Sequence, residues 1–271
     1  MLPYQYTDHR PRAVRRGAGP GASASLERML TTDHTRRRLL RHDLVWAAAG
    51  LLVAVVAGLA LDAAFRRGWL AGTPAQPLVA YLATWIPLGV AVWAVCARSG
   101  RRGAVDRLGL RFGVLDLFWG IAGGCIARLV DAVVRLQLTG STGLVPQPVL
   151  GTPTVDGWAV IVGIVAPVVV APFIEELFFR GLLQRSLASA FGGARRLRAA
   201  APAILITSVL FALAHVVVGE TSGAAAIATA AGTFAFSVIV GVIAAATDRI
   251  GGAIIAHVVF NGVAVLVLWP W

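Results

Sequence analysis

Charge-poor stretches long enough to cross a membrane follow one another along most of the chain. A hydrocarbon core of about 30 Å needs roughly 17–25 apolar residues in a helix. Such stretches occur at 44–61, 68–97, 114–138, 157–190, 199–219, 221–247 and 250–271. The pattern therefore predicts an all-α fold, a polytopic transmembrane bundle of about seven helices, within a range of about six to eight.

The third stretch is the least apolar, because it contains Arg128, Asp131 and Arg135. Their spacing places a positive, a negative and a positive side chain on one helical face, where neighbours can pair. We interpret the row as a structural salt bridge between helices in preference to a substrate contact. Gly120 and Gly124 in the same stretch favour close packing against another helix.

The composition excludes an ordinary soluble domain. Hydrophobic residues make up 58% of the chain and charged residues only 14%, and the mean hydropathy is +0.77. Soluble proteins carry about 25% charged residues. A soluble chain of 271 residues cannot bury so much apolar surface in one core, whereas lipid can cover it. Cys96 and Cys125 lie in apolar stretches without the spacing of a disulfide framework or metal motif.

The net charge is +11, and all of the Lys+Arg residues are arginine, since lysine is absent. Arginines concentrate in residues 1–42 and in the segments 98–111 and 191–200, whereas 139–157 and 219–223 contain none. This distribution follows the positive-inside rule and predicts a cytoplasmic N-terminus and a C-terminus on the opposite side. It also argues against nucleic acid as a partner.

Two regions follow from these patterns. Residues 1–42 are rich in arginine and lack a periodic apolar pattern, which predicts a flexible cytoplasmic tail that can touch anionic lipid headgroups. Residues 43–271 are predicted to form the transmembrane helical domain.

Ionisable and strongly polar side chains at bilayer depth are costly, so each is a functional candidate. Few occur here, and they lie on three predicted helices: Glu175 and Glu176, His215, and His257 with Asn261. With a rise of about 1.5 Å per residue, the expected helix ends place Glu175, His215 and Asn261 within about 6 Å of one depth. His257 lies about one turn away. We predict that Glu175, His215, His257 and Asn261 face a common cavity.

Spacing along each helix adds local detail. Glu176 and Arg180 are four residues apart, so they can form an ion pair on one face, with Glu175 pointing about 100° away. His257 and Asn261 have the same spacing and present an imidazole beside an amide. In the helix between them, Phe211 precedes His215 by one turn and can shield its ring from lipid.

A carboxylate with imidazoles supports two kinds of hydrolytic chemistry. A carboxylate can deprotonate water while polar donors stabilise an oxyanion. Alternatively, Glu175, His215 and His257 have the donor types for a divalent metal such as zinc with one open position. The H-E-x-x-H spacing that fixes two zinc ligands on one helix is absent. We therefore favour the metal-free chemistry slightly.

Three short motifs that contain these residues follow one another along the sequence. They are Pro172-Phe-Ile-Glu175-Glu176-Leu-Phe-Phe-Arg180-Gly181, then Phe211-x-x-x-His215, then His257-x-x-x-Asn261. Together they resemble the E-E-x-x-x-R, F-x-x-x-H and H-x-x-x-N motifs of the CAAX-protease and bacteriocin-processing family, over about residues 158–265.

The resemblance implies an intramembrane endopeptidase that cleaves a membrane-associated peptide or protein, in a bacterial plasma membrane. In eukaryotic relatives the substrate is a prenylated C-terminus. Carried over, Glu175 is the general base or metal ligand, and Glu176 and Arg180 support it. His215 orients or shares the catalytic water, and His257 with Asn261 stabilises the oxyanion.

Two other functions stay open from the sequence. Relatives with these motifs include bacteriocin-immunity and scaffold proteins, in which proteolysis is dispensable. Glutamate and histidine at mid-membrane also build proton or ion transport paths. Transport is disfavoured because no inverted repeat is visible and the polar residues cluster in three helices.

Overall fold

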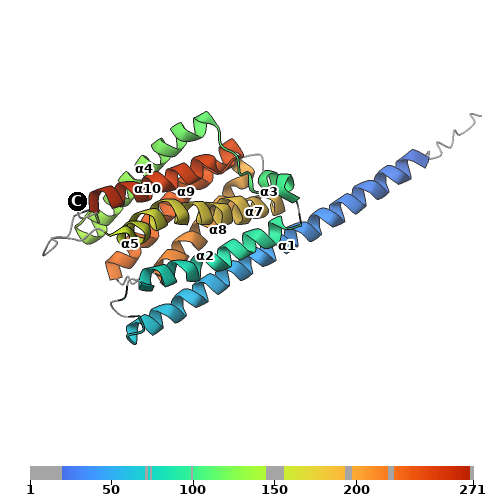
Figure 1. The fold of residues 1–271 in the computed structure, drawn as a ribbon. Coiled ribbons are helices and arrows are strands. Elements are labelled where there is room, and N and C mark those ends of the chain that lie inside the picture. Colours follow the sequence, from blue (N-terminus) through green and yellow to red (C-terminus); the bar gives the residue numbers. More distant parts are fainter. Residues whose placement is uncertain are drawn as a thin grey trace, which may run out of the picture. The chain divides into compact units, whose positions relative to one another are not determined.

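The computed structural model describes residues 20–70, 73, 75–98, 100–144, 156–192, 197–218 and 223–268, and these are helical apart from short connections (Figure 1). The α-helices are α1 (Pro20–Arg66), α2 (Ala75–Cys96), α3 (Gly100–Leu108), α4 (Val114–Thr139), α5 (Gly157–Val160), α6 (Ala171–Glu176), α7 (Arg185–Ala190), α8 (Leu197–Val218), α9 (Gly223–Thr247) and α10 (Gly251–Leu268). Two π-helical segments, η1 (Ile161–Val170) and η2 (Leu177–Gln184), adjoin α6. The all-α prediction is confirmed.

Seven helices within the described ranges are long and apolar enough to cross a membrane, as the charge-poor stretches predicted. The fourth is a single span, Gly157–Ala190, made of α5, η1, α6, η2 and α7. The others lie in α1, α2, α4, α8, α9 and α10. The protein is therefore an integral membrane protein. One element was not predicted: α3, a short polar helix within the segment 98–111.

The chain divides into one unit of residues 1–39 and a second unit of residues 40–271. Helix α1 begins at Pro20, inside the segment 1–42 that we expected to be a flexible tail. Leucine, alanine and arginine, common in this segment, are strong helix formers. Once a span provides the costly helical nucleus, its N-terminal extension adds one hydrogen bond per residue. For residues 1–19 the tail prediction lies outside the described residues.

Helices α4 and α10 approach each other closely at two glycines. A Cβ atom on Gly120 would lie 2.5 Å from the Cβ of Ile255, and one on Gly124 would lie 2.6 Å from the carbonyl oxygen of Ala256. Real side chains do not approach that closely, so only glycine fits at either position. The close helix packing predicted for this pair is present, and it holds the helix that carries His257 and Asn261.

The charged row on α4 forms ion pairs, but they lie within this helix, and not between helices as the sequence had led us to expect. Arg128 Nη1 lies 3.0 Å from Asp131 Oδ2, and Arg135 Nε lies 3.1 Å from Asp131 Oδ1. Arg128 also reaches α10, where its Nε and Nη2 donate to the carbonyl oxygen of Phe260 at 3.0 and 2.5 Å. Its guanidinium lies 3.5 Å from the centre of the Phe260 ring. Arg128 therefore joins α4 to α10 at Phe260, the residue that precedes Asn261.

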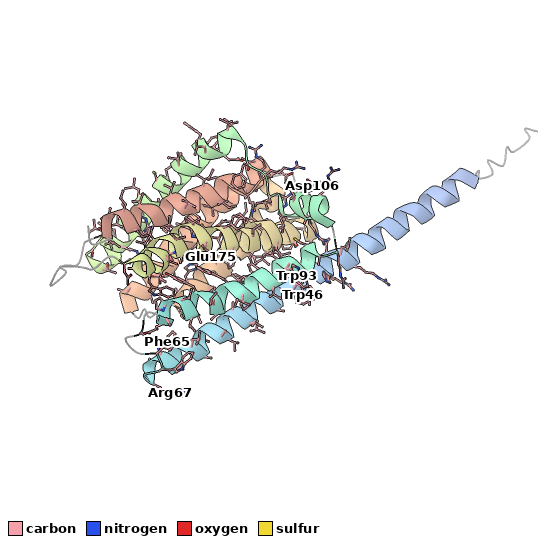
Figure 2. The ribbon with its side chains drawn as sticks, in the orientation of Figure 1. Trp46, Phe65, Arg67, Trp93, Asp106 and Glu175 are labelled. Carbon is pink, nitrogen blue, oxygen red and sulfur yellow. The ribbon has the colours of Figure 1, made fainter. Side chains whose placement is uncertain are left out.

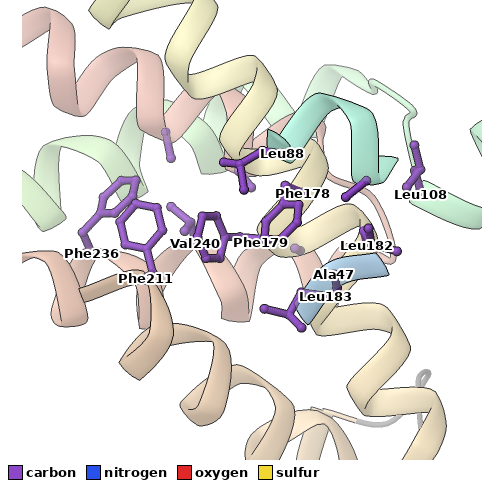
Figure 3. Close-up of a cluster of buried hydrophobic side chains, with 14 of the residues drawn as sticks. Ala47, Leu88, Leu108, Phe178, Phe179, Leu182, Leu183, Phe211, Phe236 and Val240 are labelled. Atoms are coloured by element: carbon purple, nitrogen blue, oxygen red, sulfur yellow. The ribbon is translucent and has the colours of Figure 1, made fainter. Parts of the chain in front are cut away.

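An aromatic cluster fills the centre of the second unit (Figure 3). Phe178 and Phe179 of η2 meet Phe211 of α8 and Phe236 of α9, and each of the four is at most 2% exposed. Phe211 contacts Phe179 edge-on with ring centres 5.0 Å apart. The outward side chains of the spans are apolar as well, and Phe118 on α4 is 70% exposed. That pattern is expected where lipid is the solvent.

Polar side chains mark the two ends of the spans. Figure 2 shows Phe65 and Arg67 at one end, Asp106 at the other, and Glu175 between them. At the Asp106 end, Arg107 of α3 pairs with Asp43 of α1 at 2.5 Å, and Arg249 pairs with Asp116 of α4 at 3.0 Å. These ion pairs fix the loops, while Glu175 lies far from either end.

Candidate active site

The span Gly157–Ala190 changes its helical register around the two glutamates. In η1 the N–H of Ala171 bonds to the carbonyl oxygen of Ala166, five residues earlier, instead of four. Such wide turns interrupt regular α-helix and often occur at functional sites. Glu175 and Glu176 end the six-residue helix α6, which lies between η1 and η2. The local geometry thus singles out the glutamate pair within an otherwise apolar span.

Glu176 lies at the centre of a fully buried polar network. Its side chain and that of Arg180 are both 0% exposed. Glu176 Oε1 accepts from Arg180 Nη1 at 3.0 Å and from His257 Nδ1 at 2.8 Å. Arg180 Nη2 donates to the Oγ of Ser237 on α9 at 2.8 Å, and the guanidinium packs over the Phe211 ring. Glu176 therefore links its own span to α10, and Arg180 links it to α9.

Both histidines present the same nitrogen to Glu175. His215 Nδ1 lies 2.9 Å from the carbonyl oxygen of Phe211, which can only accept, so Nδ1 carries the proton. His257 Nδ1 donates to Glu176 in the same way. Each imidazole thus turns Nε2 toward Glu175 Oε2, and both Nε2 atoms lie 4.0 Å from that oxygen. The arrangement fixes the tautomer of both rings when they are neutral.

Glu175 Oε2 is buried, and it has no hydrogen-bond partner among the described residues. Its separation of 4.0 Å from each Nε2 is beyond hydrogen-bonding reach. Within the described ranges Oε2 of Glu176 is buried without a partner too, but Glu176 differs in that its other oxygen, Oε1, receives two donors. The neighbouring glutamates therefore have different environments: Glu176 holds the network, and Glu175 points to the space between two histidines.

Asn261 is held by the span that carries the glutamates. Its Nδ2 donates to the carbonyl oxygen of Pro167 in η1 at 2.8 Å. Because a carbonyl oxygen only accepts, this contact fixes which end of the amide faces η1. The second N–H of the amide is left for other acceptors.

A cavity of about 500 Å³ opens beside these groups, and its wall is formed by residues of α1, α2, η1, α6, η2, α8 and α10. Glu175, His215 and Asn261 line it. His257 does not line it: this side chain is 5% exposed and lies behind the wall, in contact with Glu176. Three of the four residues expected at a common cavity therefore line it, whereas His257 lies behind the wall with its Nε2 4.0 Å from Glu175 Oε2.

Sequence reasoning missed several residues of this region. Ser237 receives Arg180, and Tyr81 and Thr84 of α2 contribute polar groups to the cavity wall. Serine, threonine and tyrosine are frequent in membrane helices, so none of them stands out by type. Their roles depend on which helices pack together, and no short motif records that. The contact of Glu176 with His257, across 81 positions, was missed for the same reason.

Glu175, His215 and His257 have the chemistry of zinc ligands, but their present spacing does not fit a tetrahedral ion. With ligand bonds of about 2.0–2.1 Å, neighbouring donors around tetrahedral zinc lie about 3.3 Å apart. Here the oxygen lies 4.0 Å from each nitrogen, which would require nearly straight donor–metal–donor angles. Within the described ranges no group of three such side chains has the spacing of a metal site.

Comparison with protein families gives a match to the family described as "Type II CAAX prenyl endopeptidase Rce1-like" over residues 157–263, somewhat less than half of the chain. Comparisons with curated proteins and with solved structures gave no significant match. The match covers Glu175, Glu176, Arg180, His215, His257 and Asn261. The resemblance stated from the three motifs is thus confirmed: residues 157–263 match the Rce1-like family, a family of proteases.

Proposed function

We propose that the protein is an intramembrane endopeptidase that hydrolyses a peptide bond of a membrane-associated peptide or protein. One observation carries the proposal: a buried carboxylate oxygen faces two imidazole Nε2 atoms, each 4.0 Å away, at the wall of a 500 Å³ cavity. Among the described residues Glu176 and Arg180 also leave one buried atom each without a partner, Oε2 and Nε, but both side chains are held by other hydrogen bonds. No hydrogen bond to Oε2 of Glu175 is present among these residues. A carboxylate aimed at two nitrogens that it does not touch is instead suited to hold a reactant.

That reactant is the attacking water. A water oxygen about 2.8 Å from Glu175 Oε2 and from an Nε2 atom is compatible with a separation of 4.0 Å. Glu175 takes a proton from this water while its oxygen attacks the carbonyl carbon of the scissile peptide bond. His215 Nε2 accepts the second hydrogen bond of the water and orients it. The proton then passes from Glu175 to the leaving amine as the C–N bond breaks.

The negative charge that develops on the carbonyl oxygen needs donors. Asn261 lines the cavity and, after donating to Pro167, retains a second N–H for that oxygen. His257 stabilises that charge from behind the cavity wall when it is imidazolium, with Nε2 on the side of Glu175 and its Nδ1–H remaining on Glu176. Glu176 and Arg180 act through His257 and through the packing of α9, so they are positioning residues in this scheme.

The cavity indicates the type of substrate. Apart from Glu175, His215, Asn261, Tyr81 and Thr84, its wall consists mainly of apolar and aromatic side chains. It is therefore suited to an apolar segment that reaches the site from the bilayer. The family description adds a prenylated C-terminus as the first chemistry to test.

The orientation is part of the proposal. Arg98, Arg107, Arg111 and Arg249 lie at the end of the spans where α2 ends and α10 begins, whereas Arg66 and Arg67 lie at the other. The positive-inside rule then places the N-terminus in the cytoplasm. We further propose a bacterial plasma membrane, with residues 1–42 on its cytoplasmic side and residues 43–271 as the membrane domain.

The test uses liposomes that contain the purified protein and a farnesylated C-terminal peptide, or the same peptide without the lipid. Mass spectrometry should detect a cut in at least one peptide with the wild-type protein and none with Glu175→Gln. Asp156→Asn, an acid-to-amide change at the exposed N-cap of α5, should cleave normally. Glu175-dependent proton flux without cleavage would show a transporter instead, and cleavage by Glu175→Gln would refute the assigned base.

A further inference from the structure

Pro167 and Pro172 lie five residues apart in the span that carries the glutamates. In a helix, the carbonyl of residue 167 receives the N–H of residue 171 in α register or of residue 172 in π register. The N–H of Ala171 instead bonds to the carbonyl oxygen of Ala166. Position 172 has no N–H, because it is proline. Neither helical route therefore supplies a donor to the carbonyl of Pro167.

That carbonyl has a partner from another helix. Asn261 Nδ2 donates to it at 2.8 Å, across 94 positions of sequence. Pro167 and Asn261 both line the cavity, whereas Pro172 is buried and does not line it. The contact holds the amide in one orientation and leaves its second N–H for another acceptor. A backbone donor at position 172 would compete with Asn261 for the same oxygen.

We infer that Pro172 is a positioning residue, which keeps the Pro167 carbonyl free so that this carbonyl orients the Asn261 amide. The inference rests on the proposed function in one respect only, namely that Asn261 donates to the oxyanion. The orientation itself is a property of the fold and can be measured without any substrate.

Asn261 is the only asparagine in the sequence, so labelling with ¹⁵N-asparagine gives one pair of side-chain amide proton signals in an NMR spectrum. Pro172→Ala supplies the missing N–H and should shift both signals. Lactic acid at position 172 has the alanine side chain but an ester in place of the N–H, and it should leave the signals as in the wild type. Pro202→Ala in α8, at an exposed position, is the control and should also leave them unchanged. Unshifted signals in Pro172→Ala, or equal shifts in the alanine and lactic acid proteins, would overturn the inference.

Activity provides a second readout in the same proteins. In Pro172→Ala kcat should fall by about tenfold or more, up to the loss caused by Asn261→Ala. Adding Pro172→Ala to Asn261→Ala should cause no further loss, and the lactic acid protein should retain activity. Additive losses in the double variant would contradict a role through Asn261. If the wild-type protein cleaves nothing, the proposed function fails, while the NMR signals still decide the role of Pro172.

Discussion

Arginine 180 offers the sharpest test of how the polar network contributes to folding. Its removal deletes the hydrogen bonds to Glu176 at 3.0 Å and to the Oγ and carbonyl oxygen of Ser237 at 2.8 and 3.3 Å. Glu176 would remain 0% exposed, with His257 as its remaining donor in the network. Breaking a buried pair by removing one partner typically costs about 3–5 kcal/mol. We expect Arg180→Ala to lower the free energy of unfolding by that amount.

The assay is an SDS titration in mixed micelles, followed by the fluorescence of the eight tryptophans. Arg66→Ala is the matched control, because Arg66 and Asp62 also form an i,i+4 pair but Arg66 is 64% exposed. This change should cost at most about 1 kcal/mol. The double variant Glu176→Gln with Arg180→Met removes both charges and should recover most of the stability. An unfolding midpoint of Arg180→Ala equal to that of the wild type would refute the reasoning, because the pair would then not be desolvated.

Three further predictions concern the site and its support. Asn261→Ala should lower kcat by about 10²–10³ at unchanged stability, as measured by initial rates and by the unfolding midpoint; an unchanged kcat would remove Asn261 from the oxyanion site. Gly124→Val should cost about 1–3 kcal/mol in the SDS titration, because its side chain would meet α10, whereas Gly89→Val has no atom within 4 Å of its Cβ and should cost less. Dialysis against a strong chelator should leave activity intact, and a loss that added zinc restores would contradict the metal-free mechanism.

The spans could be predicted because the membrane imposes a simple rule on sequence. Each span needs a long run with few charges, and the runs from 114–138 to 250–271 all correspond to helices of the structure. The third run is a span although it carries three charges, because Arg128 and Arg135 both pair with Asp131. Helix α3 was not predicted, since it is short, and its Arg and Asp residues are typical of loops. The extension of α1 to Pro20 was missed because it lacks an apolar stripe.

Within the candidate site, contacts along one helix were predictable and contacts between helices were not. The spacing of Glu176 and Arg180 determines their distance almost by itself, since residues four apart stack on one face. The bond from Glu176 to His257 depends on how α10 is rotated against α6, which no local pattern encodes. The contact of Arg180 with Ser237 and that of Asn261 with the carbonyl of Pro167 likewise depend on how the helices pack. Depth along the membrane could be counted from helix ends, but rotation about each helix axis required the packed structure.

The role of Glu175 as the base that activates water can be tested most directly in a single turnover in H₂¹⁸O. The wild-type protein and Glu175→Gln are each reconstituted in liposomes in excess over a cleavable membrane peptide, and the product is analysed by mass spectrometry. The account predicts that the new C-terminal carboxyl group of the product carries one ¹⁸O atom, that Glu175 carries none, and that Glu175→Gln yields no product. Label in Glu175 with an unlabelled first product would show nucleophilic attack by the carboxylate, and would contradict the account.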